Sequence, residues 1–480
     1  MPDLSSIAPA IAEIYLAFAA CVILMVDVFA GEKRAGGITA TATLFALVIG
    51  AALYATYGEV SHTVLLFDGQ FLADPLAYVL KLAGFLFLAI VLLYSRSYME
   101  RHNILRGEYY VLTLTALLGI FVLVSANSLL TVYIGVELLA LSVYAIIAFD
   151  RDNPIAAESA MKYFVLSAMA SGALLYGASM IYGLTGTLKL DELAAQLHGP
   201  VSPGIILGLV FIIVAVGFKL GAVPFHMWLP DVYQGSPSSV TLFVSTVPQI
   251  AYFALALRLL GYGLTGASPQ WTQMLIPLAV LTLIVGNVVA IVQTNLKRML
   301  AYSTIGNVGF IVLGFVTGTR AGYSAALYYT LVYVITVLGS FGVVLLVSRK
   351  GFEADKLEDY RGLYARDPVL AIIMMCLMFS TAGVPPFVGF WAKLRIFQEL
   401  WNTHHPWLVA IAAIASVIGC FYYLRMVKLM YFDPAPQELP AGSAGQGLGA
   451  RMVLLINALA VTFLGLLPAP LLDLCARVLH

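Results

Sequence analysis

Long apolar runs, separated by short polar stretches, follow one another along almost the whole chain. A membrane-spanning helix needs roughly 20 apolar residues, and fourteen runs approach that length. They lie near residues 7–29, 37–57, 75–95, 109–125, 128–149, 159–183, 203–229, 238–261, 272–293, 299–317, 321–348, 368–398, 407–430 and 452–476. The pattern predicts an all-α polytopic membrane protein with about 14 transmembrane helices. Helices 7 and 12 are expected to be broken, at Pro224 and at Pro385–Pro386, because proline interrupts helical hydrogen bonding.

Composition agrees with this class. Of the 480 residues, 61% are hydrophobic and 10% are charged, and the mean hydropathy is +0.95. A soluble domain usually has about 25% charged residues, so lipid replaces water around most of the surface. The net charge is zero, which gives no indication of nucleic acid as a partner. The four cysteines are scattered, which argues against a disulfide framework or a cysteine metal site.

The basic residues predict an orientation. Loops after odd-numbered helices carry fifteen: Lys33, Arg34, Arg96, Arg101, Arg106, Arg151, Lys297, Arg298, Arg349, Lys350, Lys356, Arg361, Arg366, Lys428 and Arg451. Loops after even-numbered helices and the C-terminal tail carry three: Lys189, Arg320 and Arg477. By the positive-inside rule, this bias predicts an even number of spans and places both termini on the outer, periplasmic side.

Three short matches at nearly one offset indicate an internal repeat. The pairs are 158–166 with 323–331, 221–228 with 382–391, and 137–142 with 298–303. The offset covers five spans, so the two copies must be inverted, as in many transporters. The predicted parts are helices 1–3 (1–108), one five-helix repeat (109–261, helices 4–8), a second inverted repeat (272–430, helices 9–13) and helix 14 (452–480). The alternative is that Val-Pro motifs merely kink membrane helices.

Charged residues inside the apolar runs indicate function. Glu137 lies in helix 5, Lys162 in helix 6, Lys219 in helix 7 and Lys393 in helix 12. Such charges are expensive in a bilayer and are usually paired, exposed to water or functional. When a buried carboxylate and a buried amine separate, desolvation favours the neutral amine. We therefore predict a proton or cation path through Glu137, Lys219 and Lys393, the alternative being a static ion pair that fixes packing.

Weaker candidates lie nearby. Glu158 and Lys162 have the spacing of an ordinary i,i+4 salt bridge, although Lys162 lies deeper and is a candidate for the path. His226 follows Pro224 and titrates near neutrality, but a hydrogen-bonded structural histidine is the alternative. Lys81, in helix 3, is long enough to reach the membrane interface. The tyrosines are expected mostly to pack or to lie at the interface.

Several strings carry a family resemblance. FKLGAVPFHMWLPDVYQGSPSSVT (218–241), QTNLKRMLAYSTIGNVGF (293–310) and GVPPFVGFWAKL (383–394) resemble the antiporter-like membrane subunits of respiratory complex I. These subunits share ancestry with multi-subunit cation/proton antiporters. VELLALSVYAIIAFD (136–150) and YYLRMVKLMYF (422–432) are most similar to the N type of these subunits. The M type usually has a proline after the helix 5 glutamate, and the L type has a long lateral helix; neither is found here.

The resemblance implies a proton-translocating membrane subunit of NADH:quinone oxidoreductase, a translocase in which other subunits pass electrons from NADH to a quinone such as ubiquinone. It assigns the helix 5 glutamate to Glu137, the helix 7 lysine to Lys219 and the outlet lysine of helix 12 to Lys393. No cofactor or metal is implied in this chain; NAD, FMN, iron–sulfur clusters and quinone belong to partner subunits. The implied partners are neighbouring K-type and M-type membrane subunits and the lipid bilayer of a bacterial inner membrane.

Two positions depart from the family pattern. Family members usually have a lysine in helix 8, where this chain has Gln249, and commonly a histidine in helix 10, where it has Asn307. Glutamine can hold water but carries no proton charge at neutral pH, so we expect waters to bridge Lys219 to Lys393. Two rivals remain: a cation/proton antiporter that works without redox energy, and a structural scaffold whose charges are idle. The charges alone cannot separate these functions.

Overall fold

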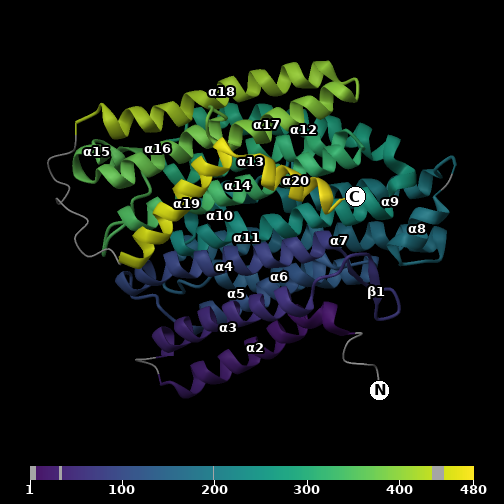
Figure 1. The fold of residues 1–480 in the computed structure, drawn as a ribbon, viewed down its shortest axis with the longest axis horizontal. Coiled ribbons are helices and arrows are strands. Elements are labelled where there is room, and N and C mark those ends of the chain that lie inside the picture. The colour runs from purple at the N-terminus through teal and green to yellow at the C-terminus, as the bar shows by residue number, and fades with distance from the viewer. Residues whose placement is uncertain (1–6, 32–34, 198, 435–447, 480) are drawn as a thin grey trace.

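Helices make up nearly all of the computed structural model, which describes residues 7–31, 35–197, 199–434 and 448–479. Most of them lie side by side, with their axes roughly along the long dimension of the molecule (Figure 1). The start of α2 (Ile11–Phe29) and the last helix, α20 (Ala469–Arg477), lie at the same end of the bundle.

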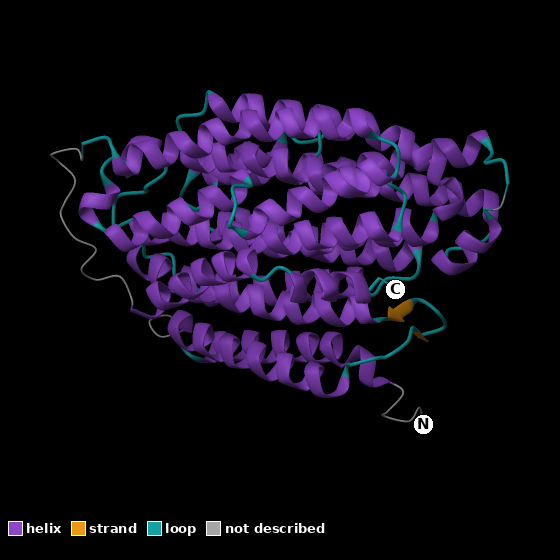
Figure 2. Ribbon diagram, turned by 45° about the horizontal axis from the view of Figure 1, so that its top comes forward, coloured by secondary structure: helices purple, strands orange, loops and turns teal. Residues whose placement is uncertain are grey.

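The N-terminal part has three long helices and one small hairpin. After the 3₁₀ helix η1 (Ala8–Ala10) come α2, α3 (Ala35–Tyr57) and α4 (Pro75–Arg101). Between α3 and α4, strands β1 (Val64–Leu66) and β2 (Phe71–Ala73) pair antiparallel, at the orange arrows of Figure 2. The expectation of a purely helical chain missed this hairpin, because three-residue strands leave no periodic pattern to recognise.

The next helices surround the first break. They are α5 (Gly107–Val124), α6 (Leu129–Ile147), α7 (Pro154–Thr185), α8 (Leu190–Gln196), α9 (Pro203–Leu220), α10 (Trp228–Gly235) and α11 (Ser238–Ala256). A π-helical turn, η2 (Leu257–Gly263), continues α11, and the 3₁₀ turn η3 (Thr265–Ala267) follows. Asn153 and Ser202 cap α7 and α9 with their side-chain oxygens, as N-cap residues commonly do.

The remaining helices surround the second break. They are α12 (Ser268–Ile291), α13 (Leu296–Val316), α14 (Arg320–Val347), η4 (Leu357–Tyr360), α15 (Leu363–Arg366), α16 (Pro368–Ala382), α17 (Val388–Asn402), α18 (Pro406–Tyr431), α19 (Leu448–Leu466) and α20. The predicted final span, 452–476, is in fact two helices, because Pro468 and Pro470 interrupt it between α19 and α20.

Among the described residues, 13 helical segments are long and apolar enough to cross a membrane. The fourteenth expected span, 368–398, is the pair of shorter helices α16 and α17. Both predicted breaks are confirmed. In each, a glycine with a positive φ ends the first helix, Gly221 at +81° and Gly383 at +87°; prolines follow, so the helix cannot resume at once.

Three helices form the core. The apolar windows of α11 with η2, α13 and α14 are 100%, 94% and 94% buried, whereas that of α18 is only 33% buried. A helix that is buried all round has no lipid-facing side. Polar side chains on α11, α13 and α14 must therefore find partners inside the protein, and they form the central part of the candidate site.

Candidate functional site

Lys219 lies in the last turn of α9, directly before the first break. Its side chain is buried, and its Nζ donates a hydrogen bond to Ser167 Oγ on α7 over 2.8 Å. Beside it, Trp228 Nε1 donates to the carbonyl of Phe218 over 2.9 Å, so the start of α10 is bound to the end of α9. The ammonium group therefore lies in an apolar and aromatic pocket with a neutral hydroxyl as its direct partner.

Glu137 projects from α6 and is half-buried. It is near enough to interact electrostatically with Lys219, but the hydrogen bond of Lys219 goes to Ser167. The structure therefore places the predicted carboxylate and amine in one region without joining them directly. The carboxylate is partly accessible at the surface of the isolated chain.

Lys393 lies in α17, just after the second break, and is buried. Its Nζ donates to the carbonyl of Ala382, at the end of α16, over 2.8 Å, and to Ser416 Oγ over 2.9 Å. The nitrogen also lies 5.3 Å from the centre of the Phe310 ring. A helix break frees carbonyls that need partners inside a membrane, and here the lysine supplies one.

The centre of the protein holds a network of hydroxyl and amide groups. Asn307 Oδ1 accepts from Tyr329 over 2.7 Å, and its Nδ2 donates to the carbonyl of Ser303 over 2.7 Å. The hydroxyls of Ser303 and Tyr423 are 2.6 Å apart. Tyr333 donates to Thr304 over 2.6 Å. The expectation that tyrosines mostly pack or face the interface therefore missed a polar network on α13, α14 and α18.

Gln249 lies on α11, which is buried on every side. Its Oε1 is buried and has no hydrogen-bond partner among the described protein atoms. Nearby on the same helix, Tyr252 interacts with Tyr163 of α7. A buried acceptor without a protein partner is a natural position for a bound water.

The weaker candidates lie at the surface. Lys162 pairs with Glu158 over 2.9 Å, as their spacing predicts, and also with Asp231 of α10 over 3.0 Å. In this chain, 47% of the Lys162 side chain is exposed, so it is not enclosed by the protein as Lys219 and Lys393 are. His226 is half-buried beside the break and lines a cavity of about 390 Å³ together with Lys162 and Asp231.

The sequence favours an anchoring or paired role for Arg258, but the partners in two buried ion pairs were not predicted. Lys81 Nζ lies 2.6 Å from Glu13 Oε1 on α2, and the lysine side chain is fully buried, so it points into the protein and does not extend along its surface. Arg258 forms two hydrogen bonds with Asp74, of 2.7 and 2.9 Å. Sequence spacing gives no signal for such pairs, because their members lie far apart in the chain.

The sequence pattern also gives the wrong environment for Lys297. It predicts an exposed loop residue, but Lys297 lies in the first turn of α13 and is buried. Glu353, in the loop after α14, is 3.7 Å from its Nζ. The basic KR pair after a polar QTN segment is typical of a loop, so only the tertiary fold could reveal the burial of Lys297.

Comparison with known proteins adds to this geometry. Residues 126–419 match the family described as "NADH:quinone oxidoreductase/Mrp antiporter, TM". The chain is 47% identical over 479 residues to NADH-quinone oxidoreductase subunit N of Thiobacillus denitrificans, covering 99% of this chain and 98% of that protein. It is 50% identical over 469 residues to the subunit N of Thioalkalivibrio sulfidiphilus, covering 97% of each.

A solved structure agrees in fold over nearly the whole chain. It is that of respiratory complex I from Thermus thermophilus with bound aureothin, which contains a chain with a TM-score of 0.81 and 30% sequence identity. The match covers 97% of this chain and 99% of that chain. The similarity therefore extends through both broken helices and beyond the 126–419 segment.

Proposed function

We propose that Lys219 and Lys393 are the two ends of a proton relay, because the chain belongs to the NADH:quinone oxidoreductase/Mrp antiporter membrane-subunit family. Within that family it is of the subunit N type of complex I. The protein is a proton-translocating, multi-pass membrane subunit of a bacterial NADH:quinone oxidoreductase and works among the other membrane subunits of that complex. Its relatives are complex I subunits, which does not favour an antiporter that works without redox energy.

One observation carries the proposal: both buried lysines have neutral direct partners. Lys219 donates to a serine hydroxyl, and Lys393 donates to a carbonyl and a serine hydroxyl. Desolvation disfavours the charged form of an amine, and a carboxylate in contact would offset this cost. With hydroxyl and carbonyl partners, each lysine can release and regain a proton when a distant charge changes.

The central network connects the two lysines in this proposal. Its hydroxyls can donate and accept protons, but hydroxyls and amides do not hold a charge at neutral pH. Waters held near Gln249 and Asn307 would therefore complete the path between the lysines. This arrangement replaces the titratable groups that the family usually has at these two positions.

Glu137 receives the energy in this proposal. It is half-buried at the surface of the chain, so a charge on a neighbouring subunit can approach it. Coulomb interactions decay slowly in a low-dielectric interior, and Glu137 already interacts electrostatically with Lys219. A charge change next to Glu137 would then alter how readily Lys219 holds its proton.

The remaining assignments follow from the same premise. The basic loops face the cytoplasm and both termini face the periplasm. Residues 109–261 and 272–430 are two inverted repeats, each with one broken helix. The neighbours are K-type and M-type subunits, and NAD, FMN, iron–sulfur clusters and quinone are bound by partner subunits.

The decisive experiment replaces Lys219 by methionine, which keeps the length of the side chain but cannot carry a proton. Inverted membrane vesicles containing the assembled complex would be tested for NADH-driven proton pumping. We expect Lys219→Met to lose most pumping per assembled complex. Lys428→Met is the matched control, because Lys428 is exposed near the end of α18; it should pump normally. Normal pumping by Lys219→Met would contradict the proposal.

A further inference from the structure

Two consecutive basic residues at the start of α13 hold the two ends of α10. Lys297 Nζ donates to the backbone carbonyl of Ser236, the C-cap residue of α10, over 2.8 Å. Arg298 Nη1 donates to Asp231 Oδ1, in the first turn of α10, over 2.8 Å. A cation at a helix C-terminus also meets the negative end of the helix dipole. The position of α10 is thus set by a helix that follows it by about sixty residues in the chain.

The opposite end of α10 is bound beside Lys219. Trp228, its first residue, donates to the carbonyl of Phe218, which directly precedes Lys219. The C-terminal end of α10 packs tightly on α7, where a Cβ at Gly235 would overlap the hydroxyl of Ser159. An eight-residue helix is a rigid unit about 12 Å long. Movement at Ser236 would therefore reach the backbone next to Lys219.

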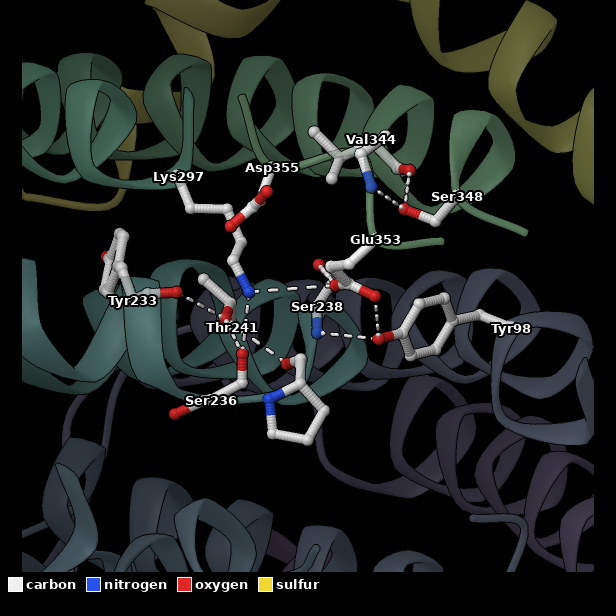
Figure 3. Close-up of polar contacts among 12 residues, drawn as sticks. Tyr98, Tyr233, Ser236, Ser238, Thr241, Lys297, Val344, Ser348, Glu353 and Asp355 are labelled. Carbon is white, nitrogen blue, oxygen red and sulfur yellow. Dashed lines mark hydrogen bonds and ion pairs between the residues drawn. The ribbon is translucent and has the colours of Figure 1, made fainter. Parts of the chain in front are cut away.

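Glu353 balances the charge of Lys297 (Figure 3). Its carboxylate lies 3.7 Å from Lys297 Nζ, accepts a hydrogen bond from Tyr98 over 2.8 Å, and accepts another from Ser238. His102 Nε2 is 3.5 Å from the same carboxylate. The side chain of Lys297 is only 4% exposed, whereas that of Glu353 is 30% exposed. Glu353 therefore links a partly exposed loop to a buried lysine at the junction of α4, α11 and α13.

We propose that Lys297 is a positioning residue for Lys219, and that Glu353 holds Lys297 in the position this requires. Glu353 orients Lys297, Lys297 holds the end of α10 through Ser236, and α10 holds the carbonyl next to Lys219 through Trp228. This inference rests on the proposed role of Lys219 as a proton carrier. Lys297 itself does not release its proton in this scheme, because the nearby Glu353 carboxylate favours its charged form.

The test uses the assembled complex in inverted vesicles, with pumping and NADH:quinone turnover each divided by the amount of complex. Lys297→Met removes both the charge and the donor to Ser236. Lys297→Arg keeps both, but an arginine side chain does not release its proton in proteins. A misplacement of about 1 Å can lower a rate by up to about 100-fold, so we expect Lys297→Met to pump about 3- to 100-fold more slowly per complex. We expect Lys297→Arg to restore at least about half of the pumping.

Glu353→Gln tests the link to the loop. It keeps the size of the side chain and one acceptor oxygen, replaces the other oxygen by an amide NH2, and leaves the buried charge of Lys297 without its counterion, so pumping per complex should fall. Glu358→Gln is the matched control in the neighbouring turn, since Glu358 is 72% exposed and pairs only at the surface with Arg361. It should pump normally. If Lys297→Met fails to assemble, Glu353→Gln still tests whether Lys297 positions Lys219.

Three results would overturn the inference: normal pumping per complex in Lys297→Met, normal pumping in Glu353→Gln, or an Arg variant as defective as the Met variant. The last would mean that position 297 must release a proton. A purely structural role would lower the amount of complex and leave its turnover unchanged. Lys219→Met, measured in parallel, separates these outcomes: if it pumps normally, the proposed function itself is wrong, whatever Lys297 does.

Discussion

Replacing Gly383 by alanine should impair proton uptake by Lys393 while changing stability only modestly. Gly383 ends α16 with a φ of +87°, a conformation that costs other residues about 1–2 kcal/mol. An added Cβ would lie 2.8 Å from Cδ of Lys393. Ordinary contacts between carbon atoms begin at about 3.5 Å, so Cδ of Lys393 must move away by about 0.7 Å. Because a lysine stem is flexible, this movement adds little to the loss of stability.

This shift of the side chain moves Nζ away from its two hydrogen-bond partners, the carbonyl of Ala382 at 2.8 Å and Ser416 Oγ at 2.9 Å. A hydrogen bond to a charged group contributes about 1.5–3 kcal/mol, and each 1.4 kcal/mol is about a factor of ten. Losing one of them would destabilise the protonated lysine, so fewer copies of Lys393 would hold a proton, and pumping per complex should slow by about 10- to 100-fold. Gly318→Ala is the control, because Gly318 has a φ of +63° and nothing within 4 Å of the added Cβ.

Both variants should lose about 1–2 kcal/mol of stability from the backbone conformation, seen as a similar shift in heat-induced loss of the complex. Only Gly383→Ala should lose proton pumping in vesicles. Equal pumping by the two variants would refute the argument, because it would show that the contacts of Lys393 with Ala382 and Ser416 do not limit translocation.

Two further predictions concern buried polar groups. Gln249→Leu should lower pumping several-fold without lowering stability, since the lost Oε1 has no protein partner; unchanged pumping, or a several-fold rise in Gln249→Lys, would contradict the water bridge. Asp74→Ala should cost about 4–6 kcal/mol, from about 1 kcal/mol for the cap on Ala77 and about 3–5 kcal/mol for the charge left on Arg258. Asp74→Asn should keep the cap and recover about 1 kcal/mol, measured as the thermal shift of the complex; identical shifts would disprove the capping role.

The sequence predicts the helices well because lipid imposes a length and a polarity on each span. The breaks at Pro224 and Pro385–Pro386 were predictable for a local reason, the missing proline N–H and the flanking glycine. The burial of Lys297 and the exposure of Lys162 were not, because each depends on which helix packs against it. The bond between Ser303 and Tyr423 joins residues 120 positions apart, and no local pattern encodes such a contact.

The structure also separates two kinds of buried charge that look alike in the sequence. Lys81 and Arg258 each contact a carboxylate, of Glu13 and Asp74, and an opposite charge in contact favours the charged form of each group. Lys219 and Lys393 instead contact hydroxyl and carbonyl groups. A charge with a fixed counterion resists losing its proton, whereas a charge held by neutral dipoles responds to a change further away. A static ion pair, the alternative for the candidate path in the sequence, is found in this protein at Lys81 and at Arg258. Lys219 and Lys393, the residues proposed to carry protons, have hydroxyl and carbonyl groups as their direct partners.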